Sequence, residues 1–288
     1  MAAPRGKLVS VNGKNMHLRQ MGHGEKTIIL LPGWGMPAPA IDFAPLMRAL
    51  ARNYTVCTIE FFGYGHSDPT DTPRTNENYV QEIREALRLA GLKPPYVLMP
   101  YSCAGVYCEY YAATYPEEIA ALVLLDSTPT VESFVKELTP TEKEINSLKS
   151  ALKPSKFLAG INRFLVSLIL RIKGEKQEHV QNGYTIEEIK EISSPTAPND
   201  GDTLIAQYTA LPDNVLEVVP MQIPREIPIL VFSSADKSGK LEMHRKGHMA
   251  KLGRQAKLVM LDDSTHTDIY WRRVYREAIC EEITEFLR

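Results

Sequence analysis

Short apolar runs alternate with amphipathic stretches along most of this chain. The runs are continuous and rich in β-branched residues, which is typical of strands that are covered on both faces of a sheet. They occur at Thr27–Leu31, Tyr54–Ile59, Tyr96–Met99, Ala121–Leu125, Ile229–Phe232 and Lys257–Leu261. Helical patterns separate them, at Phe43–Arg52, Glu77–Ala90, Ala104–Tyr115, Leu241–Leu252 and Asp268–Leu287. Strand alternating with helix predicts an α/β fold with a mostly parallel, doubly wound sheet.

The first residues add a hairpin to this pattern. Lys7–Val11 and Met16–Gln20 each alternate apolar and polar positions, and the pair Asn12-Gly13 lies between them. Asn-Gly between two such runs is a strong hairpin signal, because both residues tolerate the left-handed backbone of a tight turn. With these two segments included, we expect about eight strands in the sheet.

The alternation stops between Val131 and Pro220. This interval contains no convincing strand, only helical stretches at Glu132–Lys136, Thr141–Leu152, Phe157–Lys173 and Thr185–Ile192. We therefore expect a helical cap at 131–220, inserted between two parts of one core at 1–130 and 221–288. Apolar residues line one face of the helix expected at 157–172, which either docks on the core or roofs a hydrophobic acyl pocket.

The charge balance excludes a general attraction to nucleic acid or anionic lipid. The 288 residues include 33 basic and 35 acidic side chains, a formal net charge of −2. No apolar run reaches the roughly 18 residues that a membrane-spanning helix needs. Four cysteines show neither a C-x-x-C pair nor metal-ligand spacing. We expect a cytoplasmic protein that acts on a small molecule, without nucleic acid or membrane as partner; an anchor ahead of residue 1 and the oligomeric state stay open.

Reactive side chains follow several of the expected strands. In open α/β sheets, functional groups gather at the carboxyl ends of the strands. Ser102 comes just after Tyr96–Met99, and His266 comes after the last expected strand. A serine becomes nucleophilic when a histidine takes its proton, and a carboxylate orients that histidine. Two aspartates compete for the third role, because Asp126 and Asp236 each follow a strand.

These segments resemble those of the α/β-hydrolases over nearly the whole chain. Pro100–Gly105 resembles the Gly-x-Ser-x-Gly-Gly nucleophile elbow, with proline and alanine at two glycine positions. Pro32–Gly35 resembles the oxyanion loop of the family, and Glu60–Ser67 resembles its Asp-x-x-Gly-x-Gly-x-Ser segment with glutamate replacing aspartate. Asp236 and His266 stand where most members carry the acid and the histidine. The resemblance implies a capped α/β-hydrolase fold with Ser102, Asp236 and His266 as the triad, and Asp126 as the alternative acid.

The elbow departs from the family pattern most at Pro100. The proline ring is bulky and offers no N–H, which is tolerable at the last position of a strand. The backbone N–H of Cys103, the residue after the nucleophile, is the first expected oxyanion donor. The resemblance adds the N–H of Trp34 as the second donor. Trp34 and Tyr101 are expected to line the substrate pocket; alternatively, Trp34 is a core residue and Tyr101 packs around the helix after Ser102.

Two other patterns point to no cofactor and no metal. Gly63-x-Gly65 follows a strand, but Asp68 takes the place of the third glycine of a dinucleotide-binding loop. His244 and His248 have the i, i+4 spacing of metal ligands, without the glutamate of H-E-x-x-H. We interpret the two histidines as part of a solvated helix face.

The expected function is that of a serine hydrolase that cleaves a small or medium apolar carboxylic ester through an acyl-enzyme. An aminopeptidase similar to proline iminopeptidase is one alternative, in which cap carboxylates such as Glu187, Glu188 and Glu191 would hold the substrate's ammonium group. The other alternative is an inactive binding protein on the same fold, which the proline at position 100 suggests.

Overall fold

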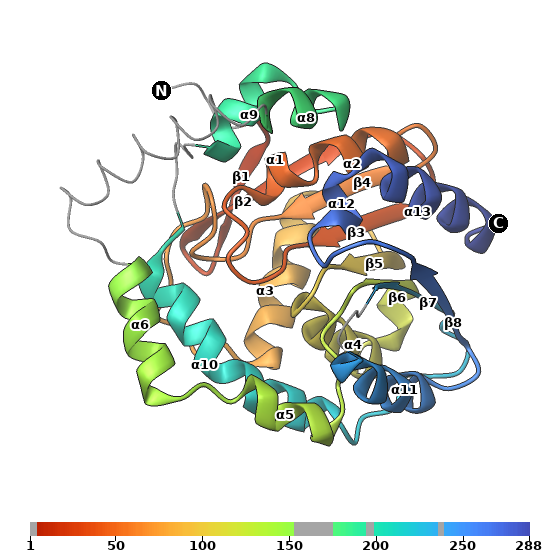
Figure 1. The fold of residues 1–288 in the computed structure, drawn as a ribbon. Helices are drawn as coiled ribbons and strands as arrows, with labels where there is room; N and C mark the ends of the chain where they lie inside the picture. Colours follow the sequence, from red (N-terminus) through yellow and green to blue (C-terminus); the bar gives the residue numbers. More distant parts are fainter. Residues whose placement is uncertain (1–4, 153–174, 194–198, 236–238) are drawn as a thin grey trace.

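The computed structural model describes residues 5–152, 175–193, 199–235 and 239–288. Its strands form one eight-stranded sheet in the order β1-β2-β4-β3-β5-β6-β7-β8 (Figure 1). They are β1 (Lys7–Val11), β2 (Lys14–Met21), β3 (Thr27–Leu31), β4 (Thr55–Ile59), β5 (Tyr96–Pro100), β6 (Ile119–Leu125), β7 (Ile229–Ser234) and β8 (Ala256–Leu261). From β4 to β8 every neighbouring pair is parallel, whereas β2 pairs antiparallel with β1 and with β4. The prediction of a mostly parallel, doubly wound sheet is confirmed.

The central strands of the sheet are buried between two layers of helices, whereas the edge strands β1 and β8 are partly exposed. Ile29 and Leu31 share a hydrophobic cluster with α3 (Asn76–Leu89) and α4 (Ala104–Thr114). Ile28 and Leu30 point the other way and cluster with α2 (Ala44–Leu50) and α13 (Arg273–Phe286). Burial on both faces explains why these strands read as continuous apolar runs. The other helices of the core are α1 (Pro39–Asp42), η1 (Pro116–Glu118), α11 (Lys240–Leu252) and α12 (Asp268–Trp271).

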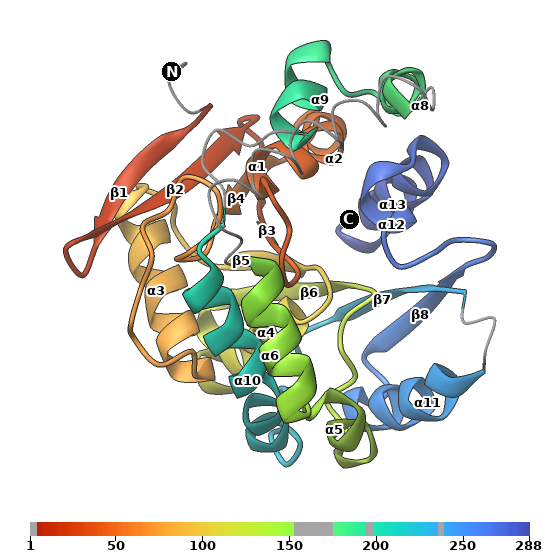
Figure 2. The same ribbon diagram turned by 60° about the vertical axis from the view of Figure 1, so that its left-hand side comes forward.

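Helices occupy the described part of the chain between β6 and β7. They are α5 (Glu132–Leu138), α6 (Glu142–Leu152), α8 (Glu175–Gln181), α9 (Ile186–Ser193) and α10 (Gly201–Val218). None of the described residues of this interval forms a strand, as expected for a helical cap. α10 packs on α4 of the core, whereas α9 packs on α1, so the cap contacts helices on both faces of the sheet (Figures 1 and 2). The helix expected at 157–172 lies outside the described residues, and the boundaries at 130/131 and 220/221 stay a prediction.

Backbone hydrogen bonds continue beyond the carboxyl ends of the central strands. The N–H of Tyr101 donates to Leu31 O on one side, and the N–H of Ser102 donates to Leu125 O on the other, both at 3.0 Å. Pro100 is the last residue of β5, so its missing N–H interrupts the sheet only at the strand end. None of the described helices is long and apolar enough to cross a membrane.

Candidate active site

Ser102 lies at a sharp turn between β5 and α4. Its φ is 58°, in the left-handed region that L-residues rarely adopt. Small neighbours make the turn possible: a Cβ added to Gly33 would lie 2.9 Å from Ser102 Cβ, and one added to Gly105 would lie 2.5 Å from Ser127 Cβ. The turn therefore has the strand–turn–helix geometry of a nucleophile elbow, despite the proline and alanine in its sequence.

His266 connects Ser102 to a carboxylate. His266 Nε2 lies 3.0 Å from Ser102 Oγ, and His266 Nδ1 lies 2.7 Å from Asp126 Oδ2. An ionised carboxylate only accepts hydrogen bonds, so Nδ1 carries the proton and Nε2 is free to accept from the serine hydroxyl. This is the arrangement that a histidine needs to act as a general base.

The surroundings of Asp126 keep its carboxylate ionised. Burial alone would raise its pKa, but the hydrogen bonds from His266 and Ser234 outweigh burial and hold the pKa below its usual value. Ser234 donates through both its N–H, at 2.9 Å, and its hydroxyl, at 2.6 Å. The charge on Asp126 is thus available to stabilise a protonated His266.

The carboxylate that His266 contacts in the described structure is Asp126, the alternative acid. Asp236, the preferred acid, lies outside the described residues. Asp126 directly follows β6, the neighbour of the serine-bearing β5, so sheet order brings it next to the histidine. Along the chain, both aspartates follow a strand equally well.

Tyr101 packs behind the histidine. Its ring stacks on the ring of His266, with centroids 4.7 Å apart and planes 27° apart, and its hydroxyl donates to His266 O at 3.0 Å. Only 4% of Tyr101 is exposed, so it contributes little surface to a pocket. Of the two expectations for Tyr101, the structure agrees with packing near the elbow, and it adds a contact with His266 that the sequence did not indicate.

The two expected oxyanion donors lie close together. Burial raises the pKa of the Cys103 thiol to about 12, and hydrogen bonds from the N–H groups of Trp34 and of Cys103 itself oppose that rise. Both N–H groups thus point toward the Cys103 sulfur, and within the described ranges neither donates to a backbone carbonyl. The same pKa keeps the Cys103 thiol protonated, which argues against a cysteine nucleophile.

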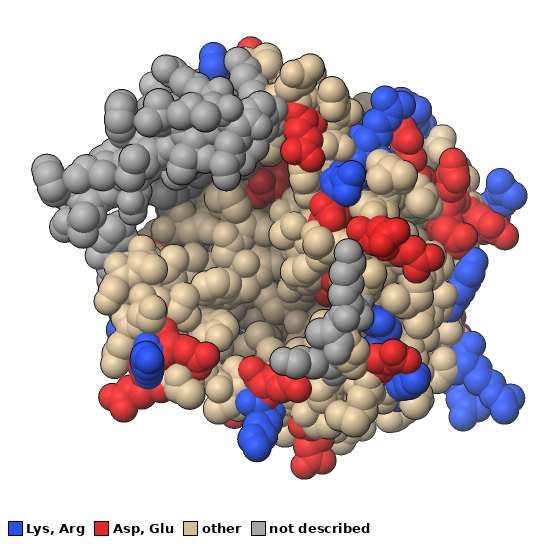
Figure 3. Space-filling model, in the orientation of Figure 1, with Lys and Arg blue, Asp and Glu red and all other residues tan. Residues whose placement is uncertain are grey.

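Trp34 lies where the core meets the cap. Its indole N–H donates to Leu204 O of α10 at 2.9 Å, and its ring lies 5.3 Å from the ring of Tyr208. A cavity of about 280 Å³ is lined by Trp34, Tyr208 and three residues of α6, Glu144, Ser147 and Leu148. Figure 3 shows a hollow on this face whose visible walls carry few charged side chains. A larger cavity of about 790 Å³ lies between α2 and α13 and is lined by none of the site residues.

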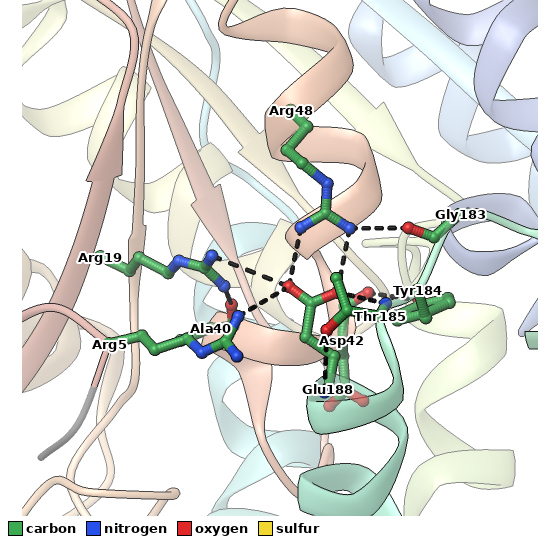
Figure 4. A network of polar contacts seen from close by, with 9 residues as sticks. All are labelled: Arg5, Arg19, Ala40, Asp42, Arg48, Gly183, Tyr184, Thr185 and Glu188. Atoms are coloured by element: carbon green, nitrogen blue, oxygen red, sulfur yellow. Dashed lines mark hydrogen bonds and ion pairs between the residues drawn. The ribbon is translucent and has the colours of Figure 1, made fainter. Parts of the chain in front are cut away.

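Glu188 of the cap is engaged with arginines of the core. Its carboxylate lies 2.7 Å from Arg48 Nη1, 3.4 Å from Arg5 Nη1 and 3.8 Å from Arg19 Nη2, and its side chain is 0% exposed (Figure 4). Burial alone would raise its pKa, but hydrogen bonds from Arg48 and from the Thr185 N–H lower the pKa below its usual value. Glu188 is therefore not free to bind a substrate's ammonium group.

His244 and His248 are buried, so the expectation of a solvated helix face is wrong. They are 2% and 4% exposed. His244 contacts Glu137 of α5 at 3.0 Å, and His248 contacts Glu109 of α4 at 2.6 Å. The two histidines point to different helices, and the described residues contain no group of three or more side chains that suits a metal ion.

Comparisons with known proteins agree with this architecture. A family model described as alpha/beta hydrolase fold matches residues 26–272. The Bacillus subtilis protein YbdG, itself uncharacterized, is 26% identical over 236 residues, which cover 80% of this chain and 69% of that protein. A hydrolase structure from Pseudomonas aeruginosa PA01 superposes with a TM-score of 0.71 at 16% identity and covers 99% of both chains.

Two further relatives have names that describe an activity. The pimeloyl-acyl-carrier-protein methyl ester esterase of Xylella fastidiosa is 30% identical over 153 residues, 52% of this chain and 55% of that protein. The human serine hydrolase BPHL is 27% identical over 180 residues, 61% of this chain and 62% of that protein. The matched part is thus less than two thirds of either relative.

Proposed function

The chain belongs to the α/β-hydrolase fold family, and from this premise we propose that it is a serine hydrolase of small or medium apolar carboxylic esters. The observation that carries the proposal is the hydrogen-bonded line from Ser102 Oγ through the His266 ring to the Asp126 carboxylate. In this proposal Asp126 replaces Asp236 as the acid of the triad.

The geometry supports a mechanism in two halves. Ser102 Oγ attacks the acyl carbonyl carbon while its proton moves to His266 Nε2, and the Cys103 and Trp34 N–H groups hold the oxyanion. The tetrahedral intermediate collapses, and His266 gives the proton to the departing alcohol. Water then attacks the acyl-serine with His266 again as base, and the acid leaves as Ser102 regains its proton. Asp126 stays ionised throughout and stabilises the imidazolium.

An ester with an apolar acyl group fits the site better than a charged substrate. The hollow of Figure 3 has few charged side chains on its visible walls, and the indole of Trp34 lies at the cavity between core and cap. The names of the Xylella and human relatives, a methyl ester esterase and a serine hydrolase, support the same reaction class.

The two alternatives receive less support. An aminopeptidase needs free carboxylates near the site, and Glu188 is paired with Arg48 while Glu187 lies exposed on the surface. An inactive binding protein needs no aligned triad, yet His266 lies within hydrogen-bonding distance of both Ser102 and Asp126. These contacts favour a catalytic esterase over the two alternatives.

Covalent labelling and ester turnover test the proposal together. A fluorophosphonate should label Ser102, and p-nitrophenyl esters of short to medium chain length should be hydrolysed. Ser102→Ala and His266→Ala should each lower kcat by about 10⁴-fold or more, because triad members act as a unit. Ser150→Ala, on the exposed face of α6, is the matched control, and the fluorophosphonate should label this variant as it labels the wild type. Folded protein that resists the probe and cleaves no ester, thioester or aminoacyl amide would favour the binding-protein alternative.

A further inference from the structure

Helix α10 of the cap inserts one polar side chain into the core beside the elbow. Gln207 is 0% exposed, although its neighbour Ala206 faces solvent. Gln207 Nε2 donates to the Tyr107 hydroxyl at 3.2 Å and to Cys103 Sγ at 3.6 Å, and Gln207 Oε1 accepts from the Tyr64 hydroxyl at 2.6 Å. A buried amide whose donor and acceptor sides are both used is held in a single orientation.

Tyr64 extends this chain of hydrogen bonds to the oxyanion loop. Its hydroxyl accepts from the N–H of Gly35 at 3.2 Å, and Gly35 directly follows Trp34. Burial raises the pKa of Tyr64 well above its usual value, so the hydroxyl keeps its proton and donates it to Gln207. The donor and acceptor of both hydrogen bonds are therefore fixed: the Gly35 N–H donates to the Tyr64 hydroxyl, and this hydroxyl donates to Gln207 Oε1.

The same helix also holds the side chain of Trp34. The carbonyl of Leu204, three residues before Gln207, accepts the indole N–H at 2.9 Å. α10 thus contacts the oxyanion loop twice, at the indole of Trp34 and, through Tyr64, at the amide that follows it. Gln207 contacts the elbow as well, through Cys103.

From these contacts we propose that Gln207 is a positioning residue of the oxyanion hole. The two N–H donors belong to separate segments, the loop after β3 and the turn after β5, and Gln207 is hydrogen-bonded toward both. It touches no reacting atom; it fixes the distance between the Trp34 and Cys103 donors, on which stabilisation of the oxyanion depends. This inference rests on the proposed function.

The test separates positioning from simple support of the fold. Gln207→Leu keeps the size of the side chain and removes its hydrogen bonds, and Tyr64→Phe removes only the hydroxyl that reaches Gly35. We expect each variant to lower kcat about 10- to 100-fold with KM nearly unchanged, because the donors shift without being deleted. Affinity for a trifluoromethyl ketone, which forms the oxyanion, should fall by the same factor as kcat/KM.

Asp213→Asn, on an exposed position of the same helix, is the control and should match the wild type in kcat. The double variant Tyr64→Phe/Gln207→Leu should lower kcat little more than the worse single variant does, because both substitutions interrupt the same chain of hydrogen bonds. If the wild type is active and Gln207→Leu retains both its kcat and its affinity for the ketone, this inference alone fails. A wild type that is inert toward esters and toward the fluorophosphonate overturns the proposed function and this inference with it.

Discussion

Ser102 and Asp126 both have left-handed backbone conformations, with φ values of 58° and 43°. This region costs an L-residue about 1–2 kcal/mol, so the surrounding structure has to impose it. The N–H of Ser102 is held by Leu125 O at 3.0 Å, and the N–H of Asp126 is held by Phe232 O at 2.8 Å. Backbone strain of this kind is concentrated at functional sites, and here two members of the proposed triad carry it.

Replacing the carboxylate of Asp126 by an amide tests which aspartate orients His266. Asp126→Asn should lower kcat by about 10⁴-fold, because an amide that donates to His266 Nδ1 favours the wrong tautomer. Asp236→Asn should have a small effect under the same ester assay. The opposite ranking of the two kcat values would identify Asp236 as the acid of the triad.

A buried carboxyl at Asp42 should make the protein less stable as pH rises. Burial raises the pKa of Asp42 from its ordinary value of 3.8 to about 7. Between these values the folded protein holds a proton that the unfolded chain has released, so the contribution of Asp42 to stability falls as pH rises through this window. It is fully present below about pH 4.

Asp42→Asn removes this titration and keeps an oxygen that can accept from the Ala38 N–H. The free energy of unfolding of the variant, relative to that of the wild type, should rise by on the order of 2–4 kcal/mol between pH 5 and pH 8. Urea unfolding of both proteins at several pH values measures the difference. A difference that stays constant across this range would show that Asp42 does not titrate there.

Contacts between ionisable side chains join cap helices to helices of the core and join core helices to one another. Glu188 attaches α9 to Arg48 of α2, and His244 joins α11 to Glu137 of α5. In α4, Glu109 accepts from His248 and from Lys251 of α11, and its pKa is lowered to about 2 although burial alone would raise it. The carboxylates of Glu188 and Glu109 thus find their partners on separate elements, where the layers meet.

Loss of the carboxylate at Glu188 should loosen the α9 helix. Glu188→Gln leaves Arg5, Arg19 and Arg48 without their shared negative charge and should destabilise the protein by about 2 kcal/mol in urea unfolding. Glu187→Gln, at the exposed neighbouring position, is the control and should stay within about 0.5 kcal/mol of the wild type. Equal effects of the two substitutions would mean that the arginine cluster does not hold α9.

In the whole molecule, the order of the strands determines which residues meet. β5 lies between β3 and β6, so the expected oxyanion loop, Ser102 and Asp126 come from three adjacent strand ends. His266 arrives from the loop after β8, farther along the sheet, and reaches across to Ser102 and Asp126. The described cap helices lie on both sides of the sheet, with α10 next to Trp34 and α9 next to α1 (Figure 2).

The sequence by itself determined the fold class and the positions of Ser102 and His266. Apolar periodicity marks the strands, and functional groups in such sheets follow strand ends, so both facts are local and readable along the chain. The acid was not decided in this way, because Asp126 and Asp236 follow strands equally well and only the spatial order of the strands places Asp126 beside His266.

Tertiary structure alone also decided which polar side chains are buried. His244 and His248 have the spacing of a surface helix face, yet α5 and α4 cover them and supply carboxylates. Gln207 lies in an amphipathic helix with nothing in its sequence to distinguish it, and its contacts with Tyr64 and Cys103 come from segments more than a hundred residues away. A hydrogen bond between distant segments depends on how whole elements pack, and periodicity along one element carries no information about that packing.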